Sequence, residues 1–405
     1  MKRPKLINKN QCTGCGSCAS ACKHNAIKMD YDHNGYLMPF INPQKCIGCH
    51  LCESKCPIIN LSKLSFHGTK DLHNFSAWSK NDDLCKQASS GGIFSQLAIN
   101  ILRKGNAVVY GAHLTHKNTV SHIGITDEKD LYLIIGTKYI QSNASSAYKE
   151  CQINLQNGKN VLFCGTPCQI AGLYATLNYK VHPNLLTAEL ICHGVGSQVA
   201  AEVATSYYGA DYIVSNRNKN DGWTSTQKRG LSQKSIYSKD GILIETESGK
   251  DIFYPCFNNT HRISCTTCHF AKINRIADIS LGDQWGLCKS FPQREKLGVS
   301  LVLTNTTQGI EAIHSEDISI IENPNYTLNA YPLFYPSVSR WTTLASFLWL
   351  LRKMPTKFTV SFITLNWKKN PLVIPFKVIW HFVGKRQLKK IKKAIYTTQK
   401  EKGWI

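Results

Sequence analysis

The chain has 405 residues, which is too long for one ordinary domain and about right for two or three. Its hydrophobic fraction of 42% is ordinary for a globular protein that buries a core. The formal net charge is +22, but no nucleic-acid recognition fold accompanies this charge, so we expect no nucleic-acid partner.

The first twelve residues, MKRPKLINKNQC, are charged and are not followed by the apolar stretch of a secretory signal. This argues against secretion and for a cytoplasmic protein in a reducing environment. The chain contains 17 cysteines. In a reducing compartment, clustered cysteines indicate metal binding more than disulfides.

Residues 1–60 contain two copies of one cysteine pattern, each with spacings of two, two and three residues. This spacing is typical of bacterial two-cluster ferredoxins, in which the fourth cysteine of each copy binds the other cluster. We therefore expect a ferredoxin-like α+β domain with two [4Fe–4S] clusters. The predicted ligands are Cys12, Cys15, Cys18 and Cys56 for one cluster and Cys46, Cys49, Cys52 and Cys22 for the other.

Glycines and a lysine within the two copies bear on this interpretation. Gly14, Gly16 and Gly48 suit loops that wrap a cluster, because such loops need residues without a Cβ penalty. Lys23 stands where the first copy would usually carry proline, which loosens the turn but removes no ligand. The alternatives are zinc and disulfides; zinc needs only four thiols per site and does not explain a cysteine at every third position.

Residues 61–84 look like a linker, and residues 85–330 have the pattern of an α/β domain, with an N-terminal part 85–160 and a C-terminal part 161–330. Apolar runs alternate with helical spacing, which predicts a largely parallel sheet. The expected strands and helices, in chain order, are helix 91–105, strands 106–114 and 159–165, helix 169–177, and strands at 185–194, near 277 and near 299.

Four further cysteines fall at places where a third metal site can form. Cys168 and Cys192 each lie just past a predicted strand, so in a parallel sheet they should be neighbours at one edge. Cys265 and Cys268 form a CxxC pair in a predicted loop. Together they make four thiolates, which favours a third [4Fe–4S] cluster over zinc, a redox disulfide or no site at all. Cys256 is the expected substitute if one of the four is wrong; the remaining thiols, Cys85, Cys151, Cys164 and Cys288, are expected to be structural, with Cys164 in the core.

Residues 331–405 form a basic, aromatic C-terminal extension, expected to be short and helical. Residues 352–405 hold fourteen lysines and arginines and one acid, Glu401. The apolar run 341–351 has only eleven residues and is too short to span a bilayer. A basic aromatic tail can hold an anionic membrane face, which suggests a peripheral position at the inner side of the membrane; the alternative is a solvated basic helix.

From the first cysteine pattern to about residue 305, the chain resembles the coenzyme F420 hydrogenase/dehydrogenase beta-subunit family. The motifs that carry the resemblance are SSGGIFSQLA, GTKYIQS, VLFCGTPCQIAGL, LICHGVGS, NRNKNDGW, CTTC and RIADISLGDQWG. The resemblance implies a flavoprotein with FAD, a nearby cluster and often an N-terminal two-cluster ferredoxin domain. In members of this family, electrons pass to the deazaflavin coenzyme or to another organic acceptor.

The resemblance also implies which residues contact FAD. The Ser-Gly loop precedes a predicted helix, whose free N–H groups make an anion site, although such a loop is more often a plain helix cap. The implied contacts are Ser89, Ser90, Gly91, Gly92, Lys138, Gln141 and Thr166. Lys138 is equally a solvated surface lysine. Arg217, Lys219 and Trp223 are expected to bind substrate or close the pocket, and Asp283 and Trp285 to lie over the flavin; the alternatives for the last two are a turn aspartate and a core tryptophan.

The sequence therefore predicts an iron–sulfur flavoprotein oxidoreductase that exchanges electrons with a redox partner protein, such as a ferredoxin or another oxidoreductase subunit. Its organic acceptor is a deazaflavin coenzyme or a substrate of a polysaccharide pathway. No general acid or base is assigned, because hydride transfer at a flavin does not require one. Two alternatives stay open: a non-catalytic electron-transfer subunit of a larger complex, and an accessory protein of surface-polysaccharide biosynthesis.

Overall fold

The structure is a computed structural model that describes residues 3–67, 73–219, 222, 235–247, 251–284 and 291–323. The predicted C-terminal extension 331–405, Trp223, Trp285 and Cys288 lie outside the described residues. Within the described ranges, no helix has the length and apolar character needed to cross a membrane.

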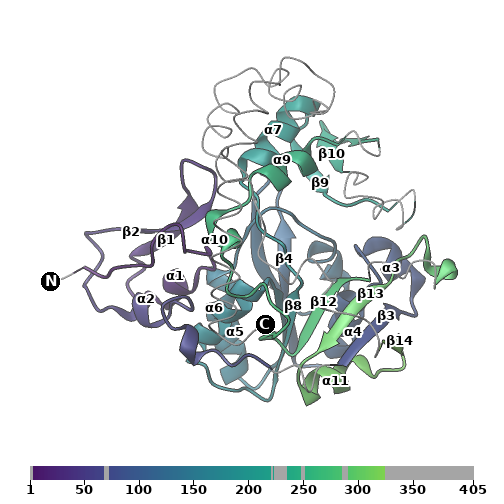
Figure 1. The fold of residues 1–405 in the computed structure, drawn as a ribbon, viewed down its shortest axis with the longest axis horizontal. Helices are drawn as coiled ribbons and strands as arrows, with labels where there is room; N and C mark the ends of the chain where they lie inside the picture. Colours follow the sequence, from purple (N-terminus) through teal and green to yellow (C-terminus); the bar gives the residue numbers. More distant parts are fainter. Residues whose placement is uncertain are drawn as a thin grey trace, which may run out of the picture. The chain divides into compact units, whose positions relative to one another are not determined.

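The N-terminal cysteine-rich region folds into a small module around one hairpin (Figure 1). Strands β1 (Ile27–Tyr31) and β2 (Leu37–Ile41) pair antiparallel, and the short helices α1 (Ser17–Ala21) and α2 (Leu51–Ser54) follow the two cysteine loops. A 3-10 turn, η1 (Leu61–Lys63), ends the module. One buried cluster of the module consists of Ala19, Ile27, Met29, Leu37 and Cys52.

The second part of the chain is built on a sheet with the strand order β14-β3-β13-β12-β8-β7-β4-β5-β6 in the described residues. The pairs β12·β8, β8·β7, β7·β4 and β5·β6 are parallel, whereas β14·β3, β3·β13, β13·β12 and β4·β5 are antiparallel. The prediction of a largely parallel sheet was therefore only partly right, since four of the eight pairings are antiparallel. The strands are β3 (His73–Ser79), β4 (Ala107–Leu114), β5 (Val120–Ile125), β6 (Ser142–Asn143), β7 (Asn160–Gly165), β8 (Leu185–Leu190), β12 (Ile279–Asp283), β13 (Ser300–Thr304) and β14 (Ile318–Glu322).

The predicted linker 61–84 is the clearest error of the sequence analysis. Residues 73–79 form β3, which lies inside the sheet between β13 and β14, and residues from 82 onward begin α3 (Asp82–Gln87). The sequence of β3, HNFSAWS, is too polar to read as a buried strand by itself. Its two partner strands, β13 and β14, come near the end of the described chain, so no pattern in the neighbouring sequence predicts the pairing.

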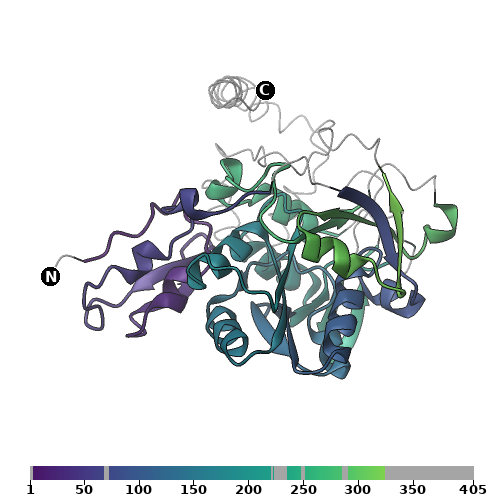
Figure 2. The same cartoon turned by 90° about the horizontal axis from the view of Figure 1, so that it is seen from below.

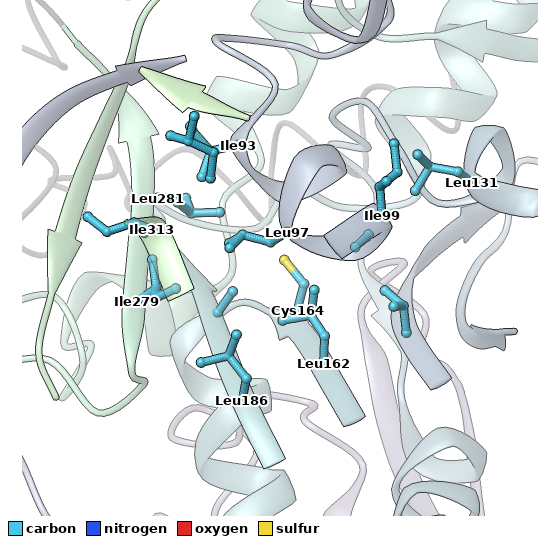
Figure 3. Packing of buried hydrophobic residues seen from close by; sticks show 14 of the residues in the cluster. Ile93, Leu97, Ile99, Leu131, Leu162, Cys164, Leu186, Ile279, Leu281 and Ile313 are labelled. Carbon is cyan, nitrogen blue, oxygen red and sulfur yellow. The ribbon is translucent and has the colours of Figure 1, made fainter. Parts of the chain in front are cut away.

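The two faces of the sheet are covered by different helices. The predicted helix after the Ser-Gly loop is confirmed as α4 (Ile93–Arg103), which packs its apolar side on one face. On β7, Leu162 and Cys164 point to this face, as Figure 3 shows, and the prediction that Cys164 belongs to the core is confirmed. The alternate residues Val161 and Phe163 point to the other face, as the two-residue period of a strand requires.

Helices α5 (Ser145–Gln156) and α6 (Pro167–Thr176) cover that second face, and the N-terminal module packs against them through α1 (Figures 1 and 2). A buried cluster joins the layers: it includes Tyr148 of α5, Ile170 of α6, and Cys56 and Ile58 of the module. The N-terminal module and the α/β sheet thus share one hydrophobic core.

A smaller region follows β8. It contains α7 (Val199–Tyr208), a three-stranded antiparallel sheet in the order β11-β10-β9, and α9 (Phe253–Asn259). The strands are β9 (Tyr212–Ser215), β10 (Ile236–Lys239) and β11 (Ile242–Glu245). The short helix α10 (Ile263–Thr266) then leads back to β12, and the remaining elements are η2 (Glu128–Leu133), η4 (Pro292–Arg294) and α11 (Thr307–Ile313).

Candidate functional site

The eight N-terminal thiols gather around two cavities. The first cavity is lined by the first thiol group, which we define as Cys12, Cys15, Cys18 and Cys56. The second cavity is lined by the second thiol group, which we define as Cys22, Cys46, Cys49 and Cys52. These are the two sets that the sequence analysis assigned, including the exchange of the fourth cysteine between the copies. Four thiols around one cavity fit a [4Fe–4S] cubane, and we propose that each of these two groups binds one cluster.

The loop of the first thiol group needs glycine at two positions. Gly14 and Gly16 have φ of 68° and 88°, in the left-handed region that other residues rarely adopt. A Cβ on Gly16 would also press against Ser145 at the start of α5. The loop is therefore shaped both to wrap a cavity and to lie close to the α/β domain.

Burial dominates the chemistry of the first thiol group. It raises the pKa of Cys15 to about 12, with smaller contributions in the same direction from Cys56, Cys168 and Cys12. Burial also raises the pKa of Cys18 well above its ordinary value. Thiolates are the form that binds iron, so cluster binding at this site must displace protons from the thiols.

A third thiol group forms at the edge of the sheet, and we define it as Cys168, Cys192, Cys265 and Cys268. The pKa of Cys192 is raised to about 12, mainly by burial and also by the neighbouring thiols of Cys168 and Cys268. Cys265 has a pKa raised by burial and by Cys192, Cys268 and Cys168. The structure thus brings these four thiols within electrostatic range of one another.

The first and third thiol groups are themselves neighbours. Cys168 contributes to the raised pKa of Cys15. Gly172 of α6 allows the approach, because a Cβ there would stand 3.3 Å from the Cys15 sulfur. The hydroxyl of Tyr148 donates to the carbonyls of both Cys15, at 3.0 Å, and Gln169, at 2.8 Å. Helices α5 and α6 therefore hold the first cysteine loop next to the third group.

In the described part of the chain, no three His, Cys, Asp or Glu side chains are arranged to hold a single metal ion. A cubane is larger than one ion and keeps its four thiolates apart at its corners.

The remaining described cysteines lie in the core. Cys85, Cys151 and Cys256 have no exposed surface. Cys256 lies in α9, where burial and the Asp251 carboxylate raise its pKa to about 12 and no thiol contributes. Its position gives no support for replacing a member of the third thiol group with Cys256.

The strand directions bring most of the other candidate residues to one edge. β12, β8, β7 and β4 are parallel to one another, and β3 has the same direction because two antiparallel pairings separate it from β12. The carboxyl ends of these five strands are where α/β proteins bind ligands. Asp283 is the last residue of β12, and the segments that follow β3, β8 and β7 contain the Ser89–Gly92 loop, Cys192 and Thr166.

The Ser-Gly loop is held tightly by the protein. Gly91 has no room for a side chain, because a Cβ would stand 2.6 Å from the Ala77 carbonyl oxygen. The Ser90 hydroxyl donates to the Val299 carbonyl at 2.9 Å, and Ser89 accepts from both the N–H and the hydroxyl of Thr137. The first turn of α4, which begins after Gly92, has N–H groups without partners inside the helix.

Lys138 and Gln141 occupy different surroundings. Lys138 is partly buried: its ammonium donates to the Ile135 carbonyl, and desolvation lowers its pKa to about 8. Gln141 donates to the Thr13 carbonyl at 2.9 Å and accepts from Arg262. Gln141 therefore joins the N-terminal module to the α/β domain. Thr166 caps α6, with its backbone N–H and hydroxyl both bonded to Gln169.

Three residues at the carboxyl end of β12 and after β9 form a buried polar cluster. Arg217 pairs with Asp283 at 2.8 Å, and both side chains are mostly buried. Lys219 donates to the carbonyls of Ser90 at 3.0 Å and Leu297 at 2.7 Å, and burial lowers its pKa to about 7. Lys219 thus connects the Ser-Gly loop at Ser90 with the segment at Leu297.

Gln284 is a buried polar residue of this region. Its side chain is completely buried, and neither amide atom has a hydrogen-bond partner in the described structure. Its backbone N–H donates to the Val299 carbonyl, the group that also accepts from Ser90. A buried amide without partners is costly, so this position suits a bound molecule that supplies them.

Models of known protein families match most of the described chain. The description "Coenzyme F420 hydrogenase/dehydrogenase, beta subunit N-term" matches residues 74–149, and the model for the C-terminal part of the same family matches residues 158–323. The chain belongs to the coenzyme F420 hydrogenase/dehydrogenase beta-subunit family. A 4Fe-4S dicluster domain matches residues 5–64, in front of the two beta-subunit regions.

The family assignment agrees with the resemblance predicted from the motifs, and the dicluster domain supports iron–sulfur clusters. This beta-subunit-family chain is similar in structure to a chain of the F420-reducing [NiFe] hydrogenase complex from Methanosarcina barkeri. The two are 17% identical with a TM-score of 0.43, over 74% of this chain and 92% of that chain. No curated protein matches it in sequence.

Sequence reasoning missed several residues of this beta-subunit-family site. Tyr148 and Arg262 join the cysteine loop to the α/β domain, and Glu189 forms a buried ion pair with Arg275 at 2.5 Å. Arg262 stands three positions before Cys265, which is the one local signal that pointed to it. Tyr148 and Glu189 have no such signal.

Proposed function

We propose that this chain is an iron–sulfur flavoprotein oxidoreductase that exchanges electrons between a redox partner protein and an organic molecule. The family assignment and the dicluster domain support the iron–sulfur and electron-transfer part. The observation that carries the proposal is the adjacency of the first and third thiol groups: the Tyr148 hydroxyl donates both to the Cys15 carbonyl and to the carbonyl of Gln169, the residue after Cys168.

The proposed cluster ligands are the three thiol groups. Electron transfer between clusters needs close approach, and α5 and α6 provide it by packing directly on the first cysteine loop. The second thiol group includes Cys49, the exposed member, so a partner protein can approach the chain on that side. A shared core between the module and the sheet keeps the first and third groups at a fixed separation.

The proposed FAD residues are the Ser89–Gly92 loop, Lys138 and Thr166, to which we add Gln284. Bound FAD supplies exchange of single electrons with clusters and of electron pairs with an organic acceptor. The α4 N-terminus offers N–H donors to an anionic group, and the partly buried Lys138 offers a cation. Gln284 offers an amide that can both donate and accept.

The Arg217–Asp283 pair lies at the same sheet edge and is proposed to form the wall that faces the organic molecule. Burial lowers the pKa of Arg217, and the Asp283 carboxylate more than restores it, so the net shift is upward and the guanidinium stays charged. A fixed charge pair of this kind orients a polar acceptor without taking up or releasing a proton. The acceptor itself is a deazaflavin coenzyme or another organic molecule.

A second candidate function is a non-catalytic electron-transfer subunit, which the family description "beta subunit" favours. The two candidates differ in what the isolated chain does. An oxidoreductase reduces an organic acceptor when supplied with reduced ferredoxin, whereas a pure electron-transfer subunit takes up electrons and stops.

The test is anaerobic purification followed by iron and flavin analysis. We expect about twelve iron atoms per chain, and acid treatment should release FAD. Cys168→Ser and Cys265→Ser should each lose about four irons and keep about eight. Full iron in both variants would overturn the third cluster, and absence of releasable flavin from the fresh protein would overturn the FAD assignment.

A further inference from the structure

Arg262 reaches from the third thiol group into the loop of the first. Its backbone is the N-cap of α10, the helix that contains Cys265. Its side chain donates from Nε to the Cys12 carbonyl at 3.0 Å and from Nη2 to the Leu37 carbonyl at 2.9 Å. Its Nη1 donates to Oε1 of Gln141 at 2.5 Å. One side chain thus touches the loop of the first group while its backbone supports a member of the third.

Among the residues that the structure describes, the guanidinium is buried without an anionic partner. Arg262 is 2% exposed. Its hydrogen-bond partners in those residues are uncharged, and the ring of Tyr36 lies 5.7 Å from the guanidinium carbon. Arginine keeps its charge in proteins, and a buried charge without a counter-charge is costly. A compensating negative charge other than a carboxylate is therefore expected next to Arg262.

The cysteine sulfurs next to Arg262 supply that charge when they bind iron. A [4Fe–4S] cluster with its four thiolates is anionic, and reduction adds one more negative charge. Arg262 is also bonded to the third group through its backbone, because the N–H of Cys265 donates to the Arg262 carbonyl at 3.0 Å. Gln141 holds the guanidinium in place by also donating to the Thr13 carbonyl beside Cys12.

We propose that Arg262 is the shared counter-charge of the first and third thiol groups and raises the reduction potential of the clusters bound there. A fixed buried cation stabilises the reduced, more negative state of a cluster more than the oxidised state. Arg262 is a positioning and potential-setting residue rather than a catalytic one. The inference rests on the proposed ligand groups. The expected effect of Arg262 on a cluster in the first group does not depend on a cluster in the third group.

The experiment is a redox titration of the anaerobically purified full-length protein, followed by electron paramagnetic resonance, with iron counted in every sample. Arg262→Gln removes the charge. We expect at least one reduction step to fall by a tenfold change in the one-electron equilibrium, which is about 59 mV. Arg262→Lys retains the charge, so its steps should lie closer to wild type than those of Arg262→Gln.

Two further variants separate charge from structural damage. Gln141→Glu keeps the shape of the Arg262 partner but places a carboxylate against the guanidinium, so the same step should fall. Arg294→Gln is the matched control, because Arg294 is also buried but bonds to Asp82 and Cys85 instead of a cluster loop. Its titration should equal that of wild type.

Unchanged potentials in both Arg262→Gln and Gln141→Glu would overturn the proposal, as would an equal fall in Arg262→Lys and Arg262→Gln. If Arg262→Gln does not fold, Gln141→Glu and Arg262→Lys decide the question. Wild-type protein with about eight irons would refute the third cluster and leave the first-group step as the test of Arg262.

Discussion

The first and second thiol groups come from two copies of one sequence pattern, yet they have different environments. In the first group Cys12, Cys15 and Cys56 are buried, whereas in the second group Cys52 is the buried member and Cys49 is exposed. The difference does not come from the cysteine loops, whose spacing is identical. It comes from α5 and α6, which cover the first loop and leave the second open. Position against a second domain, and not the motif, therefore decides which group is reachable from solvent.

Removing one ligand from each group should have the largest effect on iron content and stability. Cys15→Ser and Cys49→Ser should each lose about four irons, because each cluster needs all four thiolates. Cys15→Ser should also lower the melting temperature more than Cys49→Ser, since Cys15 is buried and its carbonyl accepts from Tyr148 of the α/β domain. Iron analysis and thermal unfolding measure both effects, and equal melting temperatures would contradict the asymmetry.

A chelator should separate the two groups by rate. In wild-type protein we expect iron release in a fast phase of about four atoms, from the second group, followed by slower release from the buried sites. The exposure of Cys49 gives the chelator direct access. Cys49→Ser should lack the fast phase. Release in a single phase from wild type would mean that burial does not protect the first group.

Tyr148→Phe tests the contact that covers the first group. The hydroxyl is buried and bonds to two carbonyls, so its removal leaves both without that donor. We expect a loss of about 1–3 kcal/mol in the free energy of unfolding and faster release of first-group iron. Tyr132→Phe is the control, because Tyr132 is 66% exposed. If Tyr148→Phe releases iron at the wild-type rate, the Tyr148 hydroxyl does not protect the iron of the first group, whatever it contributes to stability.

The smallest effect is expected at Glu53, next to the second group. Its carboxylate lies 3.1 Å from His50 in the open part of the module. A partly exposed pair of this kind contributes about 0–1 kcal/mol, so Glu53→Gln should change the free energy of unfolding by less than about 1 kcal/mol. Chemical denaturation at two salt concentrations measures it. A loss as large as that of Tyr148→Phe would contradict the view that the second group is the solvated one.

The sequence predicts the first and second thiol groups, but it does not predict why their exposure differs. The cysteine spacing predicts which thiols meet, because a cubane imposes its own geometry on the loop. Periodicity also predicts α4, α6, β4 and β7, whose apolar patterns are strong and local. Exposure of each group was not predictable, since it depends on which helices pack against which loop.

The parts that failed depend on distant pairing. The polar strand β3 was assigned to a linker because its partners β13 and β14 follow more than two hundred residues later. The bonds of Gln141 to Thr13 and Arg262 were also missed, because its motif suggested only a cofactor contact. Both outcomes follow from tertiary contacts that no local window contains.

The late pairing of β3 has a consequence for synthesis on the ribosome. Residues 73–79 emerge well before 300–304 and 318–322, and at ordinary elongation rates the interval is roughly 10–45 s. For that time the nascent chain carries a strand with unsatisfied edges, a state that invites wrong association. The cysteine module is complete before this interval begins, so iron delivery can precede closure of the sheet.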